Sequence, residues 1–392
     1  MHAWRDTWRR LLFVACLLAA APGAIADPAA PGLFDAEDTL TVAITAPWRE
    51  LIRNRNFQGA YPATIEYVDP SGAPVSLALT VERRGINRQK VCRFPPIKLR
   101  FDKETLAGTV FQGQKSLKMV THCQERSNYD QLYVLEMLAY RIYNQLTDRS
   151  FRVRPLTVTY RDTDGGKEDD PVFAFLIEDD KEVAHRLGLK KITVPSIGPQ
   201  RLDPGDAALM SLFQYLIANA DWAALRGPDP DECCHNVKLL GPKPEDAPGP
   251  LIAVPYDFDA SGLVNADYAA PAPGLPIRKV TQHLFWGYCA HNDALPGARR
   301  QVLAQEQAIY DLVSTEENLQ SRRRDRANKF LEKGFKVLRD DKDFLCLRLD
   351  VRKPWPRLAT QSCSSGKAAQ ASCQVVAASP ADRNLSAAST IS

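Results

Sequence analysis

The spacing of apolar residues changes along this chain, and that change constrains the fold more than any other feature. In the first part, apolar and polar residues alternate in short runs, which is typical of strands with one buried face. These runs are TLTVAIT (39–45), ATIEYVD (63–69), VSLALTVERRG (75–85), PPIKLRF (95–101) and KSLKMVTH (115–122). Helical spacing takes over in 127–146, and strand-like runs return at 152–162 and 172–180. The first part is therefore predicted to be β-rich with one main helix.

The second part of the chain is predicted to be mostly helical, because apolar residues recur there at helical spacing. The helical stretches are 203–221, 296–314 and 316–338, and two short strand-like runs are 236–240 and 251–256. We therefore predict an α+β fold of two lobes, β-rich over 39–180 and mostly helical over 181–362. A loose leader is expected at 27–38, and the Ala- and Ser-rich tail at 363–392 is expected to be disordered.

Residues 1–26 have the layout of a secretory signal peptide. Arg5, Arg9 and Arg10 precede the apolar run LLFVACLLAAA, and small residues lead up to a cleavage site after Ala26. No later apolar run reaches the roughly 20 residues that a membrane-spanning helix needs. We expect an exported protein, periplasmic or secreted, with no integral membrane segment after cleavage.

The cysteine count agrees with export. Nine cysteines are present, one of them in the signal peptide, and an even number remains, which suggests disulfides. Cys92 and Cys123 flank two strand-like runs and form the first expected bridge, and Cys363 with Cys373 could close a small loop. No C-x-x-C pair exists and Cys233–Cys234 are adjacent, so a zinc site is disfavoured.

The charge balance bears on the kind of partner. A formal net charge of +3 over the whole chain argues against a dedicated nucleic-acid binder. The basic run SRRRDR (321–326) lies within a helical pattern, which indicates a solvated helix face.

Two acids end an apolar run in the segment AVPYDFDASGLVN (253–265). Asp257 and Asp259 are two residues apart, so on an extended strand end their side chains point to one side. Neighbouring carboxylates repel unless a cation lies between or beside them, and Mg²⁺ or Mn²⁺ binds through such oxygens while keeping positions for phosphate. An Asx turn leading into Ser261 is the ordinary alternative.

The neighbouring segments favour a metal and phosphate site. Asp221 follows an apolar helix, Asn236 opens the next strand, and Asp257 ends the strand after that. Phosphoryl transfer needs an Asp that accepts the proton of the attacking hydroxyl, and an Asn and an Asp on the metal. His235 could bind phosphate or be a structural histidine.

A cation is expected beside Glu136, because this acid lies on the apolar face of its predicted helix. Lys98 and Arg100 share one face of their strand, and Lys118 lies in the next strand. A Lys–Glu pair of this kind holds nucleotide phosphates in kinases, although an ordinary ion pair is an equal alternative.

Two further segments could contact a nucleotide. VERRGINRQ (81–89) has one glycine beside several cations and could curl over phosphates or form a hairpin turn. IEDD (177–180), which includes Glu178, ends an apolar strand just before a helix and could give backbone contacts to adenine.

Together these segments resemble the spore-coat-protein-H (CotH) kinase-like family, over roughly residues 80–270. The matching motifs are RRGINRQ, PPIKLRF, LEMLAYRIYNQL, FLIEDD, FQYLIANADW, HNVKLL and VPYDFDASGL. The resemblance implies a two-lobed protein-kinase-like fold, with ATP and Mg²⁺ or Mn²⁺ as cofactors. It also implies that Asp221 is the catalytic acid, that Asn236 and Asp257 bind the metal with help from Asp259, and that Lys98 or Arg100 binds phosphate.

The leading hypothesis is therefore an exported kinase that transfers phosphate from ATP to hydroxyls, Ser or Thr, of a protein substrate. A catalytically inactive kinase-like binding module in the cell envelope is the alternative. A metal-dependent hydrolase is disfavoured, because no Ser, Cys or His stands beside a base at a readable spacing.

Overall fold

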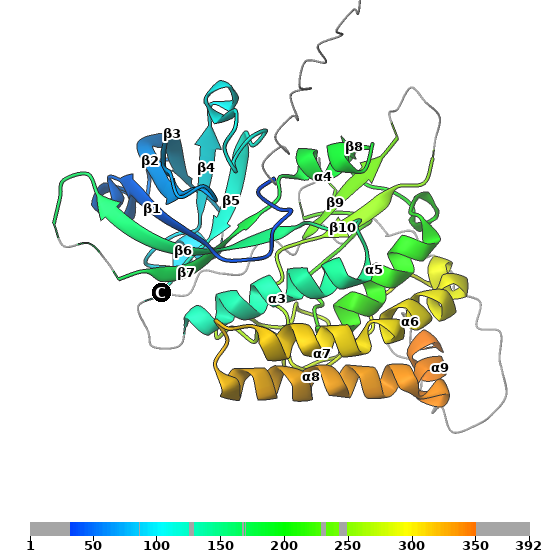
Figure 1. Ribbon diagram of the computed structural model, residues 1–392. Coiled ribbons are helices and arrows are strands. Elements are labelled where there is room, and N and C mark those ends of the chain that lie inside the picture. Colours follow the sequence, from blue (N-terminus) through cyan, green and yellow to red (C-terminus); the bar gives the residue numbers. More distant parts are fainter. Residues whose placement is uncertain are drawn as a thin grey trace, which may run out of the picture.

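The computed structural model combines a closed seven-stranded barrel, a separate three-stranded sheet and a set of helices beside them (Figure 1). The structure describes residues 32–349 except for 86, 125–128, 167, 169, 229–232 and 243–248. The predicted signal peptide, residues 27–31 of the predicted leader, the predicted tail and the Cys363–Cys373 pair lie outside the described residues.

The barrel is built from the alternating runs of the first part of the chain. Its strands are β1 (Leu40–Ala46), β2 (Ala60–Val68), β3 (Pro74–Arg83), β4 (Ile97–Phe101), β5 (Ser116–Val120), β6 (Val153–Asp162) and β7 (Val172–Ile177). They are arranged in the order β1-β2-β3-β4-β5-β7-β6, and β1 closes the barrel by pairing in parallel with β6. Ile44, Ile65 and Val81 are fully buried in its core, because alternate residues of each strand face inward.

The predicted two-lobed protein-kinase-like fold is wrong, because the β-rich part is a closed barrel and the short strands form a sheet of their own. Ile44 of β1 lies opposite Ile65 of β2 on one side and opposite Tyr160 of β6 on the other. Local alternation of apolar residues predicts each strand but does not identify its two neighbours. The parallel pairing between segments more than a hundred residues apart was therefore missed.

The separate sheet and the helices form the rest of the molecule. The sheet has the order β10-β9-β8, with β8 (Lys190–Ile192), β9 (Val237–Gly241) and β10 (Ile252–Pro255). The α-helices are α1 (Trp48–Arg53), α2 (Asn87–Val91), α3 (Asp130–Leu146), α4 (Asp180–Arg186), α5 (Pro204–Leu216), α6 (Leu295–Ala304), α7 (Glu306–Thr315), α8 (Ser321–Arg339) and α9 (Asp341–Leu349). Short 3₁₀ helices within the described residues are Lys103–Leu106, Pro199–Arg201 and Cys289–Ala294.

Helix α3 connects the barrel to the helical part. It contacts β6 and β7 of the barrel as well as α7, so most of its side chains are buried, in agreement with its apolar sequence. Helix α5 starts at Pro204, and the side chain of Asp203 caps it by accepting a hydrogen bond from the backbone N–H of Asp206. Among the described residues, no helix combines the length and the apolar character needed to cross a bilayer.

The structure contains the predicted bridge between Cys92 and Cys123, which links the end of α2 to the segment that follows β5. A second disulfide joins the neighbouring residues Cys233 and Cys234. The first bridge holds α2 beside the barrel, and α2 carries an arginine of the site described below.

A partly buried histidine, His283, makes the stability of the helical part sensitive to acid. Burial, together with the charge of Lys333, lowers the pKa of His283 to about 4, against the opposing hydrogen bond to the carbonyl of Leu216. The unfolded chain therefore takes up this proton at a higher pH than the folded protein does. We expect the free energy of unfolding to fall by about 2 to 3 kcal/mol from this group as the pH drops from about 6.5 to 4.

Urea unfolding at several pH values checks this expectation. His283→Gln should have a shallower loss of stability in this range than the wild type, whereas His185→Gln, which changes an exposed histidine, should follow the wild type. Equal slopes for wild type and His283→Gln would contradict it.

Candidate functional site

The ends of β9 and β10 bring two predicted site residues to the same place. Val237 pairs with Pro255 in the sheet, and the backbone N–H of Tyr256 donates to the carbonyl of Asn236 at 3.0 Å. Asn236 and Asp257 therefore lie at the same end of the strand pair. Both have positive φ, 52° and 63°, a conformation that Asn and Asp tolerate better than other side-chain-bearing residues. Such strained positions cluster at functional sites.

Asp221 joins this group through direct hydrogen bonds. The Nε2 atom of His235 lies 2.7 Å from Asp221 Oδ1, and Asn236 Nδ2 donates to Asp221 Oδ2 at 3.1 Å and to its carbonyl at 2.8 Å. The hydrogen bond to Asp221 raises the pKa of His235, and the charge of Asp257 adds to this effect. Asp221 and Asn236 are 15 residues apart in the sequence but are in direct contact in the structure.

Phe258 fixes the orientation of the two acids on either side of it. Its ring is fully buried, 4.6 Å from the ring centre of Tyr140 and 5.2 Å from that of Phe213. The hydroxyl of Tyr140 also accepts a hydrogen bond from the backbone N–H of Asp257 at 2.8 Å. With Phe258 anchored in the core, Asp257 and Asp259 lie within electrostatic reach of each other and of Arg88.

The cation beside Glu136 is Arg88, which comes from α2 and not from the strands predicted to supply it. Arg88 pairs with Glu136 through Nη2 and with Asp259 through Nε, the latter at 2.9 Å. The hydroxyl of Tyr268 donates to the same Asp259 oxygen at 2.9 Å. Within the described part of the chain, Glu136 Oε1 is buried and has no hydrogen-bond partner. Burial raises the pKa of Glu136 to about 7, against the opposing charge of Arg88.

Of the three predicted cations, Lys118 is the one that lies close to Asp257. Its Nζ is 4.9 Å from the ring centre of Tyr256, the residue before Asp257, and burial lowers its pKa to about 8. Lys98 pairs with Lys118 across the β4–β5 ladder, and Arg100 forms an ion pair with Glu82.

Glu178 is engaged in contacts that hold the segment after β7. Its carboxylate accepts hydrogen bonds from Arg186 at 3.0 and 2.9 Å and from the backbone N–H of Arg152 at 3.0 Å. Its own backbone N–H donates to the carbonyl of Arg152. The predicted adenine contact would therefore have to come from other backbone groups of residues 177–180.

Sequence reasoning missed the roles of Arg84 and Arg88. Both belong to the segment VERRGINRQ, which was interpreted as a phosphate loop or a hairpin. Arg84 lies just after β3, and the charge of Asp257 raises its pKa while burial lowers it more. The concentration of cations in this short segment was the available signal, but it did not indicate which acids they would meet.

The residues around Asp257 could hold a hard divalent cation that also binds water and phosphate. Burial and the charge of Asp259 raise the pKa of Asp257, so a further cation would stabilise its carboxylate. The amide nitrogen of Asn236 is turned toward Asp221, so Oδ1 is the atom of this side chain that could bind a metal. Among the described residues no group of three or more His, Cys, Asp or Glu could hold a metal. Two protein ligands with water and phosphate are a usual set for Mg²⁺.

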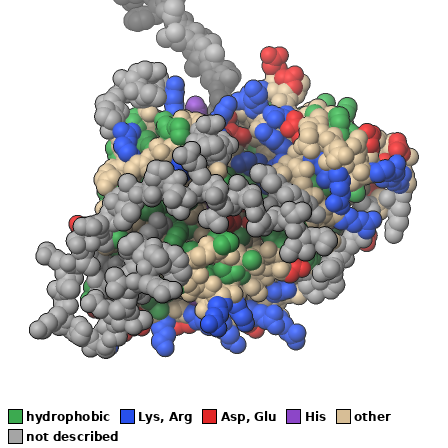
Figure 2. Space-filling view, turned by 180° about the vertical axis from the view of Figure 1, so that it is seen from behind, with side chains coloured by type: hydrophobic (Ala, Val, Ile, Leu, Met, Phe, Trp, Pro, Cys, Tyr) green, Lys and Arg blue, Asp and Glu red, His purple; other side chains and the backbone are tan. Residues whose placement is uncertain are grey.

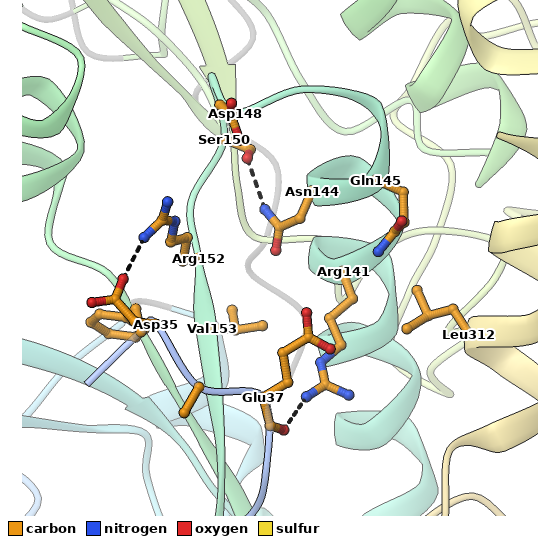
Figure 3. A pocket seen from close by; sticks show the side chains of 12 residues that line it. Asp35, Glu37, Arg141, Asn144, Gln145, Asp148, Ser150, Arg152, Val153 and Leu312 are labelled. Atoms are coloured by element: carbon orange, nitrogen blue, oxygen red, sulfur yellow. Dashed lines mark hydrogen bonds and ion pairs between the residues drawn. The ribbon is translucent and has the colours of Figure 1, made fainter. Parts of the chain in front are cut away.

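A hollow of about 280 Å³ lies away from this group, at the C-terminal end of α3 (Figure 3). The segment 34–37 forms one wall, where Arg141 donates to the carbonyl of Glu37 at 2.7 Å and Arg152 pairs with Asp35 at 2.9 Å. None of the predicted site residues lines this hollow. It is therefore separate from the candidate site.

No model of a known protein family matches this chain, and no curated protein matches it either. The geometry of the site is therefore the basis for the function proposed below.

Proposed function

We propose that this chain is an enzyme that transfers a phosphoryl group from ATP to a hydroxyl group, with Mg²⁺ or Mn²⁺ as cofactor. The convergence of Asp221, Asn236 and Asp257 at the ends of two neighbouring strands carries the proposal. Lys118 supplies a buried positive charge within electrostatic reach of Asp257. Positioning and charge neutralisation are the main contributions that proteins make to phosphoryl transfer.

Each residue has a distinct role in this proposal. Asp221 accepts the proton of the attacking hydroxyl, and its hydrogen bonds to His235 and Asn236 hold the carboxylate in one orientation. Asp257 and Oδ1 of Asn236 would hold the metal, which neutralises phosphate charge when bound. Lys118 and Arg84, which lie within electrostatic reach of Asp257, would offset the remaining negative charge of the nucleotide.

The resemblance to the CotH kinase-like family supports Ser or Thr hydroxyls of an exported protein as acceptors. Export itself is proposed from the signal-peptide pattern and agrees with the disulfide between Cys92 and Cys123.

A binding module without catalytic activity is the second candidate, and one observation favours it. Arg88 already pairs with both Glu136 and Asp259, so these two acids are neutralised without a ligand. The protein would then use the same surface to hold a partner in the cell envelope and would transfer no phosphate.

The proposal is tested by incubating the purified protein with γ-labelled ATP and Mn²⁺ and measuring label transfer to protein hydroxyls. Wild type should transfer label, and Asp221→Asn should be slower by about a hundredfold or more, because the general base is lost. Asp164→Asn, the same change at an exposed turn, should behave as wild type. Absence of transfer by all three proteins would favour the binding module, and equal transfer by all three would remove Asp221 from the mechanism.

A further inference from the structure

Helix α8 presents one row of positively charged side chains to solvent. These side chains are all exposed, and their spacing of four, three, four and three residues matches the 3.6-residue turn of a helix. They are Arg322, Arg326, Lys329, Lys333 and Lys336. We call this row the α8 cationic face. At 1.5 Å per residue it extends over about 21 Å.

The opposite side of α8 is buried and apolar. Ala327, Leu331, Phe335 and Leu338 all pack into the core. The helix therefore cannot turn these residues outward without losing its packing, and the cationic face is fixed in its direction. Contact with a partner on this face must depend on charge and not on the insertion of apolar side chains.

Two exposed acids of the helix, Asp325 and Glu332, lie beside the α8 cationic face, but neither forms an ion pair with it. Among the described residues, none of its five members forms an ion pair, although ion pairs are common elsewhere on the surface. The nearby Glu332 is engaged by Arg339 and by the hydroxyl of Tyr310. Figure 2 shows Lys and Arg side chains gathered along the lower edge of the molecule, the edge at which Figure 1 places α8.

The α8 cationic face lies apart from the candidate site. Helix α8 packs on α5, α6, α7 and α9, and α7 packs in turn on α3, which also contacts β6 and β7 of the barrel. The site is built from α2, α3, β5 and the ends of β9 and β10, and none of its described residues belongs to α8. A partner bound to α8 would leave the site accessible.

We propose that the α8 cationic face docks this protein on the surface of a membrane that contains anionic phospholipids. A straight row of long, flexible cations suits a plane of phosphate headgroups, which attract such side chains individually. The row contains no aromatic side chain on which the bases of a single-stranded nucleic acid could stack. It also has no exposed apolar centre of the kind that dominates protein interfaces. The formal net charge of the whole chain is only +3, so the attraction to an anionic membrane would come from this one face and not from the surface as a whole.

Sedimentation with lipid vesicles tests the proposal. The wild-type protein should bind phosphatidylglycerol vesicles but not phosphatidylcholine vesicles, and high salt should release it, because the contact is electrostatic. Replacing all five members of the α8 cationic face with glutamine should abolish binding, since each charge contributes about fivefold in affinity. The control replaces five exposed cations elsewhere with glutamine and should bind as the wild type does. The control positions are Arg53, Lys115, Lys181, Arg278 and Lys279.

Each other outcome overturns the proposal. Vesicle binding that persists in the α8 variant, or that is lost equally in the control variant, would show that this face is not the docking surface. Binding to duplex DNA but not to phosphatidylglycerol vesicles would replace the membrane with a nucleic acid as the partner. Thermal unfolding of each variant confirms that it is folded, and the assay does not depend on ATP or on catalytic activity.

Discussion

Replacing Asp257 with asparagine is expected to lower the rate of phosphoryl transfer by about a thousandfold. In the proposed site, Asp257 follows the end of β10 and is the one charged metal ligand. Its pKa is raised, which indicates that an added cation would stabilise its carboxylate. Asparagine keeps the size of the side chain and the hydrogen bond from the backbone N–H to Tyr140, so the loss should come from charge alone.

Metal binding gives this prediction a second measurement that does not depend on turnover. Titration calorimetry with Mn²⁺ and a non-hydrolysable ATP analogue should detect binding by the wild type and much weaker binding by Asp257→Asn. Asp164→Asn again serves as the control, because it makes the same change at an exposed turn. Unchanged Mn²⁺ binding and unchanged transfer in Asp257→Asn would exclude this residue as a metal ligand.

Replacing Arg88 with methionine is expected to lower the free energy of unfolding by about 3 to 5 kcal/mol, because it leaves two buried acids without their cation. Arg88 pairs with Glu136 and Asp259, and both partners are largely removed from solvent. The same change at Arg100, whose ion pair with Glu82 is more exposed, should cost less than about 1 kcal/mol. Urea unfolding of the two variants makes the comparison.

The loss in Arg88→Met should also depend on pH. Without Arg88, the pKa of Glu136 must rise further, because the charge that now lowers it is gone. A buried acid with a raised pKa destabilises the folded state above its unfolded pKa and ceases to do so where it is protonated. The stability deficit should therefore be smaller at pH 5 than at pH 8, and adding Glu136→Gln should recover part of it. A deficit that is equal at both pH values would mean that Glu136 is not the group left uncompensated.

Local patterns in the sequence predicted the elements that carry the site. The alternating runs before residue 123 form the strands β1 to β5, and helical spacing in 127–146 predicted α3. The sequence also showed the pair of acids on either side of Phe258, but not their conformation: Asp257 follows the end of β10 with a φ of 63°, so the expected extended strand end is not present. The bridge between Cys92 and Cys123 followed from their positions beside two strands.

The tertiary structure alone decided which of these elements meet. The barrel closes through the parallel pairing of β1 with β6, and that pairing overturned the predicted two-lobed fold. Arg88 reaches Glu136 from 48 residues away and Asp259 from 171 residues away, so the strand cations favoured by sequence are not its partners. The spacing of apolar residues indicates which side of a helix or strand is buried. The partner of a strand or a charge is set by packing and strand register over the whole chain, which no single segment encodes.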